Sequence, residues 1–69
     1  MMNPAIQQEI ISLALKTALH NENIIASKYA MLAQSITEPS LQKHLQSLEQ
    51  TARNHLQLIN QQMKQLNIS

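Results

Sequence analysis

Residues 41–66 read LQKHLQSLEQTARNHLQLINQQMKQL, and their apolar positions recur every three or four residues. That period places the side chains in one line along a helix. The apolar members of this line are Leu41, Leu45, Leu48, Ala52, Ile59, Met63 and Leu66. His55 occupies the remaining position. The spacing therefore predicts an amphipathic helix over residues 39–67, with one histidine inside its apolar stripe.

The other sides of this helix carry mostly uncharged polar residues. They are Gln42, Gln46, Gln50, Asn54, Gln57, Asn60, Gln61 and Gln62. A polar outer side is what an amphipathic helix presents to water. We therefore expect these amides to be solvated.

A second helix is predicted upstream, over residues 4–36. Asn3 can accept hydrogen bonds from the free amides of a first turn, and Pro4 suits the first helical position. One broad line along this helix is apolar except at Glu22. It comprises Ile11, Leu15, Ala18, Leu19, Ile25, Ala26, Tyr29, Leu32, Ala33 and Ile36. We expect this line to pack on the stripe of the following helix.

The same upstream helix has another apolar line on its opposite side, if each residue turns the helix by about 100°. This line comprises Ile6, Ile10, Leu13, Ile24 and Met31, and it is interrupted by Thr17 and His20. A single partner helix can cover only one of the two lines. The pattern therefore predicts either a second partner or an exposed apolar line.

The segment between the two helices contains the one strong break in the helical pattern. Pro39 disfavours a helical conformation at Glu38 and suits the start of a new helix, which Thr37 or Glu38 would cap. A connection this short normally returns the chain antiparallel to itself. We therefore predict an all-α protein, a single helical-hairpin domain over residues 1–69.

Composition adds a prediction about assembly. The chain has 69 residues, no cysteine and no glycine. A domain this small buries little surface, and disulfides are not available to stabilise it. We therefore predict a homodimer in which two hairpins form an antiparallel four-helix bundle.

Charge and hydropathy point away from two classes of partner. The net charge is +1, and only Arg53 and Lys64 among the basic residues share a helix face, which disfavours nucleic acid as a partner. No apolar run is long enough to cross a membrane. The N-terminus lacks the pattern of a secretory signal, so a cytoplasmic location is expected.

Glu22 and His55 are the polar members of the two apolar stripes. Glu22 lies some fifteen residues before the turn and His55 some seventeen after it, a mismatch of only about 3 Å along the helix axis. We therefore predict that the two side chains meet in the core. One interpretation is a hydrogen-bonded pair that fixes the register of the helices. The alternative is a pair of metal ligands, doubled in a symmetric dimer.

Three segments carry a resemblance to a known family. They are HNENIIASKY at residues 20–29, TEPSL at residues 37–41 and ARNHL at residues 52–56. Together they resemble the helical hairpin of ferritin-like proteins, and among these the small spore coat proteins of the coat-F type. The similarity extends over roughly residues 13–63.

The resemblance implies a fold, a location and a possible cofactor. Ferritin-like di-metal sites take a Glu from one helix and a Glu-x-x-His pair from another. Glu22 and His55 match the first and last of these positions, whereas Ala52 replaces the second Glu. The resemblance therefore implies that the complete di-iron site is missing. It places the protein in the spore coat, with other coat proteins as further partners.

No nucleophile with a neighbouring base, glycine-rich phosphate loop or other catalytic motif is present, so no enzymatic activity is expected. We therefore predict a non-enzymatic structural or interaction protein, associated with the spore coat and without a metal or other cofactor. The alternative is a reduced ferritin-like protein that binds iron or zinc between subunits through Glu22 and His55.

Overall fold

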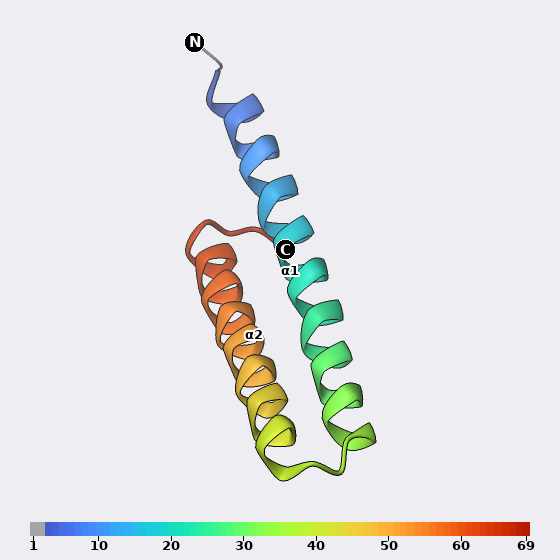
Figure 1. The fold of residues 1–69 in the computed structure, drawn as a ribbon. Helices are drawn as coiled ribbons and strands as arrows, with labels where there is room; N and C mark the ends of the chain where they lie inside the picture. Colours follow the sequence, from blue (N-terminus) through green and yellow to red (C-terminus); the bar gives the residue numbers. More distant parts are fainter. Residues whose placement is uncertain (1–2) are drawn as a thin grey trace.

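Two long helices form an antiparallel hairpin in the computed structural model, which describes residues 3–69 (Figure 1). The first helix, α1 (Pro4–Ser35), is followed by α2 (Pro39–Gln65), and the described residues contain no strand. The hairpin measures 53 × 19 × 16 Å, and the N-terminal turns of α1 extend past the end of α2. The predicted all-α hairpin is confirmed, and the helices end one and two residues earlier than the predicted positions 36 and 67.

Both helix starts follow the capping rules expected from the sequence. The Asn3 side chain accepts a hydrogen bond from the Ile6 amide at 2.9 Å. At the start of α2 the Glu38 carboxylate accepts from the amides of Ser40 at 3.1 Å and Leu41 at 2.6 Å. Pro39 lies at the first position of α2. Of the two predicted caps, Glu38 is therefore the one that acts.

Glu38→Ala is expected to lower the free energy of unfolding by about 1 kcal/mol, because two amides of the first turn lose their acceptor. Urea unfolding followed by circular dichroism at a fixed protein concentration measures this change. Glu38→Asp, which keeps a capping carboxylate, serves as the matched control and should lose much less. Equal losses in both variants would contradict the capping role.

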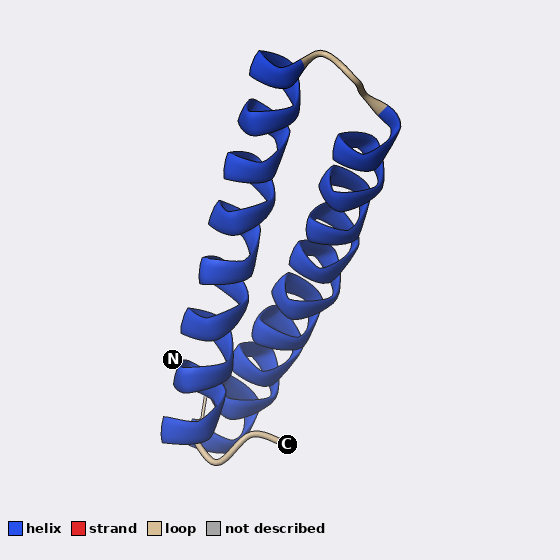
Figure 2. Cartoon of the chain, turned by 90° about the horizontal axis from the view of Figure 1, so that it is seen from below, coloured by secondary structure: helices blue, strands red, loops and turns tan. Residues whose placement is uncertain are grey.

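A short loop, tan in Figure 2, connects the two helices. A side chain of α2 ties the end of α1 to the start of α2. The Gln42 amide donates to the carbonyl oxygens of Ala33 at 3.0 Å and Ile36 at 3.3 Å. These carbonyls belong to the end of α1, where the helix leaves its acceptors free. The expectation that Gln42 is simply solvated is therefore wrong, because the returning helix brings its amide within reach of these acceptors.

The C-terminal end of α2 closes with a left-handed residue. Asn67 has a φ of 55°, which asparagine tolerates better than most residues. The amide of Ile68 then donates to the Met63 carbonyl at 2.8 Å, and that of Asn67 donates to the Lys64 carbonyl at 3.2 Å. This pair of bonds is a Schellman motif. The Gln8 side chain reaches the Leu66 carbonyl at 3.3 Å and holds this end against α1.

Small side chains lie at the centre of the contact between the helices. Ala26 is completely buried, and the other buried residues are Ala33, Ala52 and Met63. Alanine lets two helix backbones approach closely, so this line fixes how each helix is rotated. The broad stripe predicted on α1 is consequently covered only in part. Ile11, Ile25 and Leu32 stay exposed, as does Leu41 of α2, because one partner helix covers only a narrow line.

Candidate functional site

One long side of the hairpin is apolar, and we call it the open apolar face. Ile25 of α1 and Leu48 and His55 of α2 line the same shallow depression, so they lie on one side of the hairpin. Residues seven positions apart repeat that placement along each helix. The face therefore comprises Ile11, Ala18, Ile25 and Leu32 of α1 and Leu41, Leu48 and His55 of α2. Leu58, three residues after His55, lies at its edge.

The residues of this face remain largely accessible in the single chain. Ile11, Ile25 and Leu32 of α1 are exposed, as are Leu41 and Leu58 of α2. On α1 these residues recur every seven positions from Ile11 to Leu32, and on α2 from Leu41 to His55. A monomeric protein seldom exposes a long contiguous apolar surface, and such surfaces usually mark contact sites.

Glu22 and His55 meet near the middle of this face. The Nδ1 atom of His55 lies 3.2 Å from Oε1 of Glu22, and it donates to the carboxylate when it carries a proton. The predicted contact between these side chains is confirmed. Their predicted place in the core is wrong for the single hairpin, because the His55 side chain is 52% exposed and that of Glu22 is 23% exposed. A polar contact this accessible stabilises the hairpin by no more than about 1 kcal/mol.

A depression of about 180 Å³ adjoins the pair, and its walls are mainly apolar. It is lined by Glu22, Ile25, Tyr29, Leu48, Thr51, Ala52 and His55. The depression opens outward between the two helices, so a side chain of another molecule could enter it. Glu22 and His55 therefore lie beside an apolar depression, on the surface that a partner would cover.

The opposite side of the hairpin is polar. Its depression is lined by Ala30, Ala33, Gln34, Gln42, Gln46, Glu49 and Arg53. Arg53 donates to the Glu49 carboxylate at 2.7 Å, one helical turn away. The charge of Arg53 is therefore partly compensated within its own helix, which leaves it less available to an anionic partner. The groove between the helices is thus apolar on one side of the hairpin and polar on the other.

A single hairpin brings too few potential ligand side chains together to hold a metal ion. Residues 3–69 contain no group of three or more His, Asp or Glu side chains that could hold a metal ion together. Ala52 lines the same depression as Glu22 and His55, so the missing carboxylate of the Glu-x-x-His pair would have been near them. One chain therefore supplies one imidazole and one carboxylate, and a metal site would need ligands from a second chain.

Leu58 is a member of the open apolar face that the predicted stripe did not include. It lies three residues after His55 and is largely exposed. Positions three apart share a side of a helix. The spacing between His55 and Leu58 was therefore readable from the sequence. That Leu58 belongs to an exposed apolar face followed only from the rotation of α2, which places His55 at the edge of the contact between the helices.

Fold and site together define an all-α helical hairpin with an amphipathic cross-section and a polar pair on its apolar side. No family model, no curated protein and no solved structure matches the chain. Among the described residues, neither helix is long and apolar enough to cross a membrane.

Proposed function

We propose that the protein is a non-enzymatic structural or interaction component that forms a homodimer through its open apolar face. Two hairpins packed by these faces make an antiparallel four-helix bundle. The observation that carries this proposal is the division of the hairpin into an apolar side and a polar side. Helices of a bundle bury their apolar lines in a common core and leave their polar sides in water.

The second copy is the partner that best fits the shape of this surface. Each helix presents side chains at heptad spacing, which is the pattern that interdigitates between paired helices. In a symmetric dimer the same surface meets itself. The Glu22–His55 pairs of two chains would then lie inside the bundle, where a hydrogen-bonded pair is tolerated and an isolated charge is not.

A place in the spore coat, among other coat proteins, rests on the resemblance of the three sequence segments described above. A small, cofactor-free bundle is a reasonable building unit for a protein layer. Enrichment of the protein in purified spores of its source would support this location. If the gene is expressed during sporulation but the protein is absent from the purified spores, the spore-coat location is wrong.

Sedimentation equilibrium tests the dimer directly. The chain is expected to have twice its 7.8 kDa mass at micromolar concentration. A folded monomer at micromolar concentration would refute the proposal. Circular dichroism on the same samples separates a folded monomer from an unfolded one.

A second candidate function is metal binding between two chains, and the contact at 3.2 Å between His55 and Glu22 favours it. Two copies of this pair would supply two imidazoles and two carboxylates, a set that suits zinc or iron. Under this alternative, the protein purified without chelator is expected to contain about one metal ion per dimer, and His55→Ala to lose it. His44→Ala is the matched control, since His44 is exposed and lies outside the pair. Metal below one tenth of an ion per chain, unchanged after titration with Zn²⁺ or Fe²⁺, would exclude this function.

A further inference from the structure

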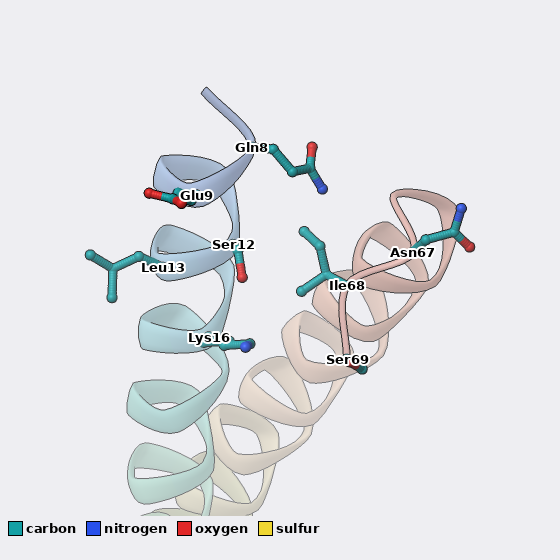
Figure 3. Close-up of a pocket in the computed structure, with 8 residues that line it drawn as sticks. All are labelled: Gln8, Glu9, Ser12, Leu13, Lys16, Asn67, Ile68 and Ser69. Carbon is teal, nitrogen blue, oxygen red and sulfur yellow. The ribbon is translucent and has the colours of Figure 1, made fainter. Parts of the chain in front are cut away.

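The side of α1 that points away from α2 carries its own regular line of side chains, which we call the outer seam. Its positions alternate steps of four and three residues: Ile6, Ile10, Leu13, Thr17, His20, Ile24, Ser27 and Met31. This is the spacing of a coiled-coil seam. Its five large apolar side chains are between 40% and 68% exposed. Figure 3 shows Leu13 directed away from the C-terminal segment that packs on the other side of α1.

The outer seam is complementary to itself in the antiparallel direction. When a second α1 is laid antiparallel with its residue 27 level with residue 10, all eight positions find a counterpart. The pairs are Ile6 with Met31, Ile10 with Ser27, Leu13 with Ile24, and Thr17 with His20. Two pairs are apolar, and the polar pair falls beside the two-fold axis. A shift by one heptad in either direction leaves two positions of each copy without a counterpart.

The surface of the outer seam has a hollow where this pairing needs one. An open depression of about 430 Å³ is lined by His20, Asn23, Ile24, Ser27, Lys28 and Met31. Ser27 is the small residue of the seam, so it leaves room that a larger side chain would fill. In the antiparallel pairing, Ile10 of the second copy lies level with Ser27, and its Leu13 lies level with Ile24. Each copy thus offers two apolar side chains to the hollow of the other, as knobs enter holes in coiled coils.

We infer that the outer seam is a second self-association surface, at which α1 of one molecule pairs antiparallel with α1 of another. About half of each of five apolar side chains is available, which gives an interface near or below the roughly 1,000 Å² at which specific contacts become stable alone. The contact is therefore weaker than that of the open apolar face. The contact between outer seams is independent of the proposed dimer. Only its role in joining dimers into larger assemblies rests on that proposal.

Two different two-fold contacts on one chain have a structural consequence. The open apolar face and the outer seam lie on different sides of α1, so both can be occupied at once. Each contact is isologous and uses up one surface of each molecule. Alternation of the two contacts links dimers into a chain of molecules or closes them into a tetramer.

Disulfide trapping tests the register, because the chain contains no cysteine of its own. A mixture of the single variants Ile10→Cys and Ser27→Cys is expected to form a cross-linked heterodimer under mild oxidation. Neither variant alone should cross-link efficiently, and a mixture of Ile6→Cys with Ile10→Cys is the matched negative control. A cross-linked Ile10→Cys homodimer would indicate parallel pairing and would overturn the inference. So would the lack of any Ile10–Ser27 cross-link at millimolar concentration.

Sedimentation velocity over a range of concentrations separates this contact from the dimer contact. Leu13→Gln is expected to raise, by about tenfold or more, the concentration at which species larger than the dimer appear. The dimer itself should persist. Leu32→Gln, on the open apolar face, should weaken the dimer instead.

Repeating the cross-linking experiment in chains that also carry Ile25→Glu, which targets the open apolar face, distinguishes failure of the dimer proposal from failure of the outer-seam inference. A cross-link that survives supports the outer seam even if the dimer proposal fails, whereas species above the dimer that are unaffected by Leu13→Gln would overturn the inference.

Discussion

Ile25→Glu is expected to raise the dissociation constant of the dimer by at least about 100-fold, which corresponds to about 2.8 kcal/mol. Ile25 lies at the centre of the open apolar face and lines the depression beside the Glu22–His55 pair. The substitution removes an apolar side chain from each protomer and adds a carboxylate one turn from Glu22. In a closed bundle two such charges would be buried without a partner, a cost of several kcal/mol. In the single hairpin Ile25 is 40% exposed, so the monomer should keep its fold.

Sedimentation equilibrium of the variant and the unmodified chain measures this change, and circular dichroism reports whether α1 and α2 persist. Gln34→Glu is the matched control, because it adds the same charge to the polar side of the same helix. That control should dimerise as the unmodified chain does. If both variants dimerise equally well, the open apolar face is not the dimer interface.

Ala26→Leu is expected to destabilise the hairpin by about 2–3 kcal/mol, because three carbon atoms are added where two helices touch. Ala26 has no exposed surface, and the helices would have to separate to admit the larger side chain. For a chain of this size the loss corresponds to a fall in Tm of roughly 10–20 °C. Thermal unfolding followed by circular dichroism, at one fixed concentration, measures it.

The control for this substitution is Ala5→Leu, which adds the same atoms to an exposed position of the same helix. Its effect on Tm should be small, since surface substitutions usually change stability by no more than about 0.5 kcal/mol. A Tm that is equally insensitive to both substitutions would mean that α1 and α2 are not in close contact at Ala26.

The alanine line also explains why part of the site was misjudged from the sequence. Counting residues from the turn was sufficient to bring Glu22 and His55 together, because helix rise is constant and the connection is short. Counting does not give the rotation of a helix about its axis when its apolar stripe is broad. The prediction therefore correctly placed Glu22 and His55 opposite each other along the helix axis. It wrongly placed both side chains in the core of the hairpin.

Gln42 illustrates the same limit for polar groups. It was assigned to the solvated side with the other glutamines, but its amide reaches the carbonyl oxygens at the end of α1. The pattern of polar and apolar residues treats Gln42 and Gln46 alike. What separates them is the distance of each from the turn, where the end of α1 leaves acceptors free.

The sequence by itself determined the two helices, their boundaries within two residues, the antiparallel hairpin and the height at which Glu22 faces His55. These features depend on local sequence. Asn3 and Glu38 cap the two helices, and Pro4 and Pro39 begin them. The constant rise per residue then sets the level at which Glu22 meets His55. Only the packing of α1 against α2 selects which residues of the broad α1 stripe are buried. Ala26, Ala33 and Ala52 permit the closest approach of the backbones, so they take the centre of the contact and turn Ile25, Leu32 and His55 outward. That rotation, a property of both helices together, creates the open apolar face.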